Sequence, residues 1–150
     1  MLGRTLRDPL GLESAAGEVE GLGLLSVVTT FTPVKTTVRV RARAAMTAGV
    51  FAGARGLEVS AYEIHAGSTD AVGGERPFTL TWRNGAATDE ADGAMNASGT
   101  VVGTYLHGLF ANEGLRRALP VHLAARKGLA PDLRLLARLL RVDPRRLSSS

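Results

Sequence analysis

The chain contains no cysteine among its 150 residues. This excludes a disulfide framework, a thiolate zinc site and a cysteine nucleophile within these residues. No apolar run approaches the roughly 20 residues that a membrane-spanning helix needs. The first residues, MLGRTLRDPLGLES, also lack the apolar centre of a secretory signal. We therefore expect a cytoplasmic protein that has no membrane as a partner.

Aromatic residues are scarce as well, at 5% of the chain, although the net charge is +4. A basic chain invites a nucleic-acid-binding interpretation, whose signature would be salt-dependent binding. Bases stack on aromatic side chains, and few are present. The arginines are spread along the chain, and the densest cluster, RLLARLLRVDPRRL (134–147), alternates with leucines as an amphipathic helix does. We expect no nucleic-acid partner.

Alternating and β-branched residues predict strands over the first two thirds of a chain whose length fits one domain. The expected strands are 21–31, 34–46, 57–67, 77–85 and the beginning of 100–110. Asn84-Gly85 is a hairpin signal at the end of the fourth strand. We expect a loop over 1–20, a turn over 47–56 and a polar loop over 87–99, because these segments are rich in glycine and polar residues.

Helical patterns occupy the last third. Asn112 is a candidate N-cap for a helix that ends at Gly128, and Pro120 predicts a kink or a division into two shorter helices. A second amphipathic helix is expected from Pro131 to Arg141. Because a complete α/β domain alternates strands and helices from its start, this order resembles the back half of such a domain. We assign residues 1–128 to it and residues 129–150 to a C-terminal helix and basic tail.

The histidines are the main candidates for chemistry. His107, in GTYLHGLF, follows a strand-like run, where an open α/β sheet places catalytic groups, and an imidazole can act as general base and acid. The alternative is a structural histidine that is hydrogen-bonded to the backbone. Glu63 and His65 share one face of a strand and form either a pocket-lining pair or a pair at a strand edge. His122 lies among Ala and Leu in a helix, which favours a structural role.

Two other kinds of site have little support. Glu63, His65 and His107 could be assembled into a metal site, but no ligand spacing such as HExxH is present. Gly21-Leu22-Gly23 is only part of a phosphate-binding motif, and we expect these glycines to turn the chain into the following strand.

Four segments together resemble one family. They are MLGRTLRDPLGLES (1–14), GLGLLSVVTTF followed by Lys35-Thr36, YEIHAGST (62–69) and the run DG…GTVVGTYLHGLF (92–110). In this order they are similar to the glutamine amidotransferase domain of the cobyric acid synthase family. The resemblance covers roughly three quarters of the chain, to about the helix after Phe110. It implies an α/β fold of the class I amidotransferase type, an open, mostly parallel sheet with flanking helices that here lacks its N-terminal strands.

The resemblance also implies the chemistry. Enzymes of this family hydrolyse glutamine at a cysteine and pass the ammonia to an ATP-dependent synthetase domain. That domain amidates corrin carboxylates, converting adenosylcobyrinic acid a,c-diamide to adenosylcobyric acid. The family cysteine lies in a Gly-x-Cys-Gly-Gly-x-Gln-Met-Leu-Gly motif whose last three residues match Met1-Leu2-Gly3. The nucleophile is therefore expected just before Met1, and ATP and magnesium in the synthetase domain, with no cofactor in this chain.

Site residues follow from the matched motifs. His107 corresponds to the catalytic histidine, and Tyr62, Glu63 and His65 belong to the YEIH segment, which is expected to line the substrate pocket. Many class I amidotransferases carry a glutamate two residues after the histidine. Leu109 occupies that position here, which implies a Cys–His dyad. Ala66 replaces the usual methionine of the YEIH segment, a tolerable change.

The expected partners are glutamine, the upstream nucleophile-bearing segment, the synthetase domain and, through that domain, a corrinoid substrate. Without the nucleophile the chain alone is expected to be inactive, and with an unpaired sheet edge it is expected to be poorly soluble or partly ordered. The alternative is a catalytically inactive remnant that acts as a binding or interaction module.

Overall fold

The computed structural model of the chain describes residues 1–130. The helix predicted from Pro131 to Arg141 lies outside the described residues, as does nearly all of the tail assigned to 129–150. None of the helices within residues 1–130 combines the length and the apolar composition that crossing a membrane requires.

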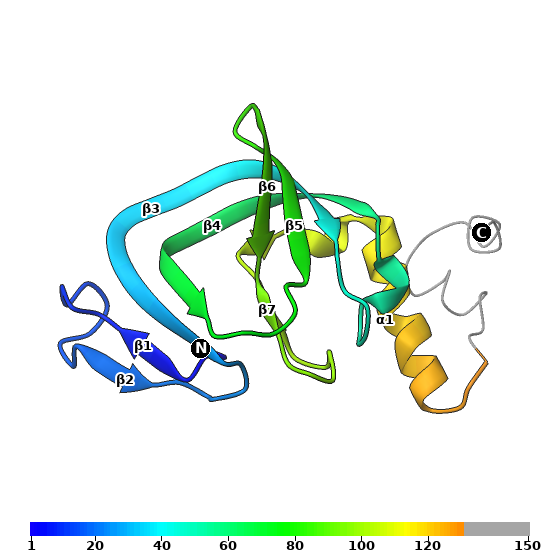
Figure 1. The fold of residues 1–150 in the computed structure, drawn as a ribbon, viewed down its shortest axis with the longest axis horizontal. Coiled ribbons are helices and arrows are strands. Elements are labelled where there is room, and N and C mark those ends of the chain that lie inside the picture. The colour runs from blue at the N-terminus through cyan, green and yellow to red at the C-terminus, as the bar shows by residue number, and fades with distance from the viewer. Residues whose placement is uncertain (131–150) are drawn as a thin grey trace.

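Two long antiparallel strands form the frame of the fold (Figure 1). β3 (Val27–Ala44) pairs with β4 (Glu58–Ala71), from Val27 opposite Ala71 to Arg43 opposite Glu58. The strands predicted over 21–31 and 34–46 are thus one continuous strand. Pro33, which has no N–H to donate, lies where the register shifts between Phe31 and Thr36.

The other strands extend this frame. β5 (Phe78–Arg83) pairs with β3, and β9 (Leu106–His107) pairs with β4. β5 and β6 (Ala86–Asp92) form a hairpin whose turn residues, Asn84 and Gly85, have φ values of 46° and 93°. This confirms the Asn-Gly turn, because that hairpin type needs positive φ at both positions.

Four strands lie in segments that were expected to be loops: β1 (Thr5–Arg7), β2 (Glu18–Glu20), β6 and β7 (Ala94–Met95). β6 falls in the expected loop 87–99; it is largely exposed, so its polar sequence carries little strand signal. β1 and β2 fall in the expected loop 1–20, and each is only three residues long. β7 and β8 (Val102–Gly103) form a separate two-stranded sheet. Such short strands are specified by their neighbours rather than by periodicity.

Strands and a helix on one core place the chain in the α/β class. Within residues 1–130, however, the pairing differs from the expected mostly parallel sheet: β1 with β3 is the one parallel pair, and the other pairs are antiparallel. The physical reason is connectivity. Parallel neighbours need long crossovers, usually helical, whereas here α1 (Glu113–Arg126) follows the last strand instead of linking two.

The main core lies between the concave face of the strands and the helical segment. It includes Phe78 and Leu80 of β5, Val59 of β4 and Leu115 of α1, all almost fully buried. Two 3₁₀ turns, η1 (Ala52–Ala54) and η2 (Leu109–Ala111), pack on α1. Helix α1 runs through Pro120 as a single element, so the two-helix alternative is wrong.

Candidate functional site

His107 lies at the end of the two-residue strand β9, at one edge of the seven-stranded sheet. Its ring is exposed. The ring Nδ1–H donates a hydrogen bond to the Tyr105 carbonyl at 2.9 Å. This leaves Nε2 as the unprotonated nitrogen of the neutral ring, and no partner for it lies among the described residues. His107 thus carries an oriented imidazole with one basic nitrogen facing outward.

Tyr62 shares the surface on which His107 lies. The two residues are opposite each other in the β4–β9 pair, and Arg39 is opposite Tyr62 in the β3–β4 pair. Because residues directly opposite each other point to the same face of a sheet, the three side chains form a row. Tyr62 is 46% exposed, and the Arg39 guanidinium lies over its ring, 5.7 Å from the centroid.

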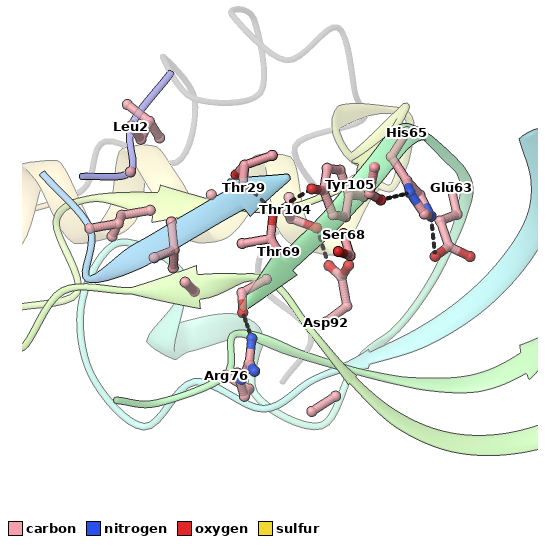
Figure 2. Close-up of a pocket in the computed structure, with 18 of the residues that line it drawn as sticks. Leu2, Thr29, Glu63, His65, Ser68, Thr69, Arg76, Asp92, Thr104 and Tyr105 are labelled. Carbon is pink, nitrogen blue, oxygen red and sulfur yellow. Dashed lines mark hydrogen bonds and ion pairs between the residues drawn. The ribbon is translucent and has the colours of Figure 1, made fainter. Parts of the chain in front are cut away.

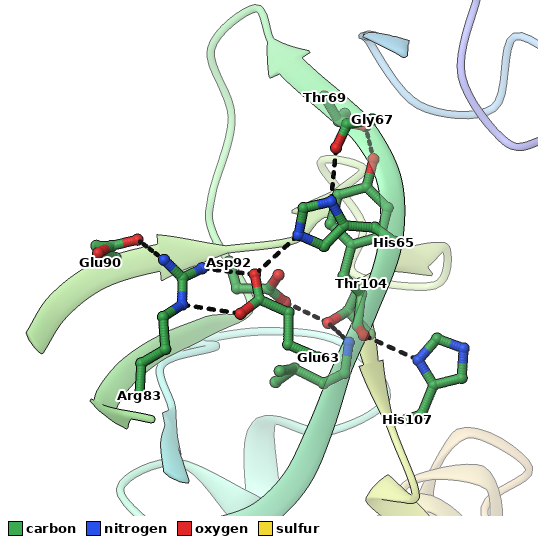
Figure 3. A network of polar contacts seen from close by, with 11 residues as sticks. Glu63, His65, Gly67, Thr69, Arg83, Glu90, Asp92, Thr104 and His107 are labelled. Carbon is green, nitrogen blue, oxygen red and sulfur yellow. Dashed lines mark hydrogen bonds and ion pairs between the residues drawn. The ribbon is translucent and has the colours of Figure 1, made fainter. Parts of the chain in front are cut away.

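Glu63 points to the opposite face, where it is 3% exposed and carries a buried network of polar contacts (Figure 3). Its Oε2 accepts from Arg83 Nε at 2.8 Å, and its Oε1 accepts from Arg83 Nη2 at 2.5 Å. This two-point contact with Glu63 is the main reason why the pKa of Arg83 is raised above its usual value. Glu90 holds the same guanidinium from the solvent side, at 2.9 Å from Nη1.

Both ring nitrogens and the ring face of His65 make contacts in this network. Nε2 lies 3.2 Å from Glu63 Oε1, and Nδ1 lies 2.6 Å from the Gly67 carbonyl. The ring also stacks on Tyr105, with centroids 4.5 Å apart. Both ring nitrogens therefore face acceptors, and neither is free to take a proton from a substrate. The expected Glu63–His65 pair is formed, and both residues line a cavity, as the pocket-lining alternative predicted.

A cavity of about 550 Å³ opens beside this network (Figure 2). Glu63, His65, Tyr105 and Asp92 are among the residues that line it. Burial is the main cause of a raised Asp92 pKa, which hydrogen bonds from Thr104 and the Tyr105 backbone partly oppose. His107 and Tyr62 do not line this cavity.

The structure thus divides the four residues predicted for the site into two pairs. Tyr62 and His107 lie together on the exposed face, and Glu63 and His65 lie together on the cavity side of β4, as Figure 3 shows for His107 and the Glu63 network. Alternation along β4 explains the division, since neighbouring residues of a strand point to opposite faces. Leu109, two residues after His107, is buried in the main core.

Arg83, Asp92 and Tyr105 complete the network, but sequence reasoning missed them. Arg83 stands 20 residues from its partner Glu63. Asp92 lies at the end of β6, a segment that the sequence predicted to be a loop. No periodicity connects such positions. Asp92 and Tyr105 were within reach, because both lie in the run 92–110 that was already singled out for its resemblance to a family.

Two other possibilities were weak in the sequence and gain no support. Within residues 1–130 no group of three or more His, Asp or Glu side chains is placed to hold a metal ion. The backbone N–H groups of Gly21, Leu22 and Gly23 donate to carbonyls of Arg4, Met1 and Gly3, which leaves them no role in holding a phosphate. These glycines turn the chain toward β3, as predicted.

Comparison with known proteins agrees with the motifs. A family model of the CobB/CobQ-like glutamine amidotransferase domain matches residues 1–115. A cobyric acid synthase from Sorangium cellulosum is 44% identical over 140 residues, covering 86% of this chain and 27% of that protein. Another, from Rhodobacter capsulatus, is 46% identical over 118 residues, covering 79% of this chain and 22% of that protein. The chain spans about a quarter of the length of these curated relatives.

The family match covers every element from β1 to the first turn of α1, including β4, β9 and the strands β5 to β8 between them. It therefore includes all four predicted site residues and the network behind them. On this evidence the chain belongs to the CobB/CobQ-like glutamine amidotransferase domain family.

Proposed function

We propose that this chain supplies the histidine of the glutamine-hydrolysing site in a cytoplasmic enzyme of the cobyric acid synthase type. Glutamine is hydrolysed at a cysteine outside these 150 residues, and the ammonia passes to a synthetase domain that amidates corrin carboxylates, yielding adenosylcobyric acid from its a,c-diamide precursor. ATP and magnesium serve that synthetase domain. The family match and the cobyric acid synthase relatives support this proposal.

The observation that carries the proposal is the orientation of His107. Its Nδ1–H is fixed on the Tyr105 carbonyl, so the exposed Nε2 is the nitrogen that takes a proton. In the proposed reaction Nε2 removes the thiol proton, and the thiolate attacks the side-chain amide carbon of glutamine. The imidazolium then protonates the amide nitrogen, which leaves as ammonia as the thioester forms. The same nitrogen takes a proton from the water that attacks the thioester and returns it to the departing thiolate, which releases glutamate.

The site works as a Cys–His dyad in this proposal. The position of the usual glutamate is Leu109, whose side chain is buried in the core and holds η2 in place. The Tyr105 carbonyl takes over the orienting role, because a backbone oxygen can fix the imidazole tautomer and accept from the imidazolium. A carbonyl lacks the full charge of a carboxylate, so we expect it to stabilise the imidazolium less.

The predicted substrate-binding residues take different parts. Tyr62 lies next to His107 on the exposed face, and we expect it to contact the glutamine. Glu63 and His65 border the site from the cavity side, where they hold β4 and Tyr105 in position. His65 shapes the wall without transferring protons, since both of its ring nitrogens are engaged.

The test compares His107→Ala with His122→Gln, a control within helix α1, in the protein expressed from its complete reading frame. We expect His107→Ala to lower glutamine-dependent amidation by 10²-fold or more, the range for loss of a general base, and to leave amidation from added ammonia unchanged. Glutamine hydrolysis within a few-fold of wild type would refute the role of His107.

A second measurement addresses the chain by itself. Because it has no cysteine, the purified 150-residue chain should release no ammonia from glutamine. A binding module without catalysis would instead be supported if the complete reading frame also lacks a cysteine-bearing segment. Mass spectrometry of the native protein, searched for peptides that join such a segment to MLGR, separates the two functions.

A further inference from the structure

The strand that carries His107 ends abruptly. β9 pairs with β4 only through Leu106 opposite Glu63 and His107 opposite Tyr62. Gly108 then takes a left-handed conformation, with φ of 78°, and turns the chain into η2. The next residue of β4 with backbone groups toward this edge is Ser60, and β9 has no residue left to pair with it.

The side chain of Asn112 takes the place of the missing strand residue. Its Oδ1 accepts from the Ser60 N–H at 3.0 Å, and its Nδ2 donates to the Ser60 carbonyl at 3.0 Å. The amide thereby mimics a peptide group and extends the β4–β9 ladder by one pair. The same Nδ2 donates to the Leu109 carbonyl at 2.9 Å, which closes the loop that follows His107.

This use of Asn112 differs from the one that the sequence predicts. The residue stands at the N-cap position of α1, but its side chain makes no capping hydrogen bond to the helix. Its acceptor and its donors are directed to β4 and to Leu109 instead. A residue with a purely helical role would direct its oxygen to the N–H groups of the first turn.

We propose that Asn112 is a positioning residue for His107, an inference that rests on the proposed function of this site. Residues 106–107 are tied to β4 by backbone pairing, and Asn112 ties the chain five residues later to the same strand. Together these anchors fix the backbone on both sides of the imidazole. Without the second anchor, the loop 108–111 and the ring can shift by the distances that markedly slow catalysis.

Asn112→Asp separates this role from helix capping. Asp and Asn are about equal as N-caps, so a capping role predicts an unchanged protein. A positioning role predicts damage, because the carboxylate cannot donate to the carbonyls of Ser60 and Leu109. Asn112→Ser is the second variant: it keeps a good cap, adds no charge and removes the ties to Ser60. Asn96→Asp, in another loop, controls for the added charge.

The first readout is independent of activity. In the protein expressed from its complete reading frame and labelled with ¹⁵N-histidine, the imidazole ¹⁵N signals of His107 report its tautomer. We expect Asn112→Asp and Asn112→Ser to shift or broaden these signals, with helix content unchanged by circular dichroism and with no effect of Asn96→Asp. Unchanged His107 signals in both variants would overturn the inference, whatever the activity.

The second readout is kinetic. In the protein expressed from its complete reading frame, both variants should lower kcat for glutamine hydrolysis at least tenfold, change KM less than threefold and leave ammonia-dependent amidation intact. Wild-type kcat in both variants would refute the positioning role. Perturbed His107 signals combined with a fully active His107→Ala variant would refute the proposed function and leave the contact itself supported.

Discussion

The buried contact between Glu63 and Arg83 allows a sharp test of how the cavity side of β4 is held. Glu63→Gln keeps the shape and one acceptor of the side chain but removes its charge. Glu90→Gln makes the same change on the other side of the same guanidinium. Glu63 is 3% exposed, whereas the Glu90 side chain is 55% exposed. The two variants therefore differ mainly in burial and geometry.

The expected magnitudes follow from that difference. Removing one partner of a fully buried ion pair costs about 3–5 kcal/mol. The Arg83 side chain is 35% exposed and keeps Glu90, so water and that second carboxylate offset part of the loss. We expect Glu63→Gln to lower the free energy of unfolding by about 2 kcal/mol. For Glu90→Gln, an exposed pair, we expect about 0.5 kcal/mol or less.

The assay is urea denaturation of the protein expressed from its complete reading frame, at neutral pH, followed by far-ultraviolet circular dichroism. The same titration of the isolated 150-residue chain tests the expectation that this chain alone is only partly ordered, because a sharp cooperative transition would contradict that expectation. The transition of Glu63→Gln should depend less on salt than that of wild type. If both variants lower stability equally, the two-point contact does not hold β4, and the reasoning from burial fails.

Three further predictions concern stability. Burial raises the pKa of Asp92 above its ordinary 3.8, so the free energy of unfolding should fall as pH rises through the pKa of the folded state. Urea titrations at several pH values should show no such fall for Asp92→Asn, and a pH profile identical to that of wild type would disprove this prediction. Backbone N–H donors, that of Glu13 foremost, lower the pKa of Asp8. Its contribution to stability is therefore present above pH 3.8 and lost as the pH falls below that value. Asp8→Asn should make stability fall less steeply at acid pH, and a fall as steep as that of wild type would count against this prediction. Gly49→Ala would place its Cβ 2.2 Å from the Gly99 carbonyl oxygen at φ of +84° and should lower the free energy of thermal unfolding by at least about 2 kcal/mol. Gly56→Ala, with the same backbone strain but open space around its Cβ, should cost about 1 kcal/mol. Equal costs would show that the close approach at Gly49 relaxes.

Local patterns in the sequence predicted the parts of this protein that depend on neighbouring residues. Alternation predicted the long strands, although Pro33 hid the continuity of β3. Asn84-Gly85 predicted its hairpin, because the required backbone conformation is a property of those two residues. The segments around Met1, Tyr62 and His107 predicted the family, which the match over residues 1–115 confirms.

The arrangement of the site was decided only by tertiary structure. Arg83 reaches Glu63 across 20 residues, and Asn112 reaches Ser60 across 52. Such contacts depend on which strands pair and in which register, and a pairing partner leaves no periodic trace in either segment. The short exposed strands escaped prediction for a related reason, since their conformation comes from the neighbours they join.

The sequence by itself therefore determined the long strands, the helix after Asn112, the family and the residues that belong to its motifs, because these depend on local periodicity and on the order of residues along the chain. Alternation placed Glu63 and His65 on one face of a strand, but only the tertiary structure decided that His107 lies opposite Tyr62, on the face away from them. It also decided that the amide of Asn112 pairs with β4 instead of capping a helix. The physical reason is that side-chain hydrogen bonds go to whichever partner the fold brings within reach, and the strand register sets that partner.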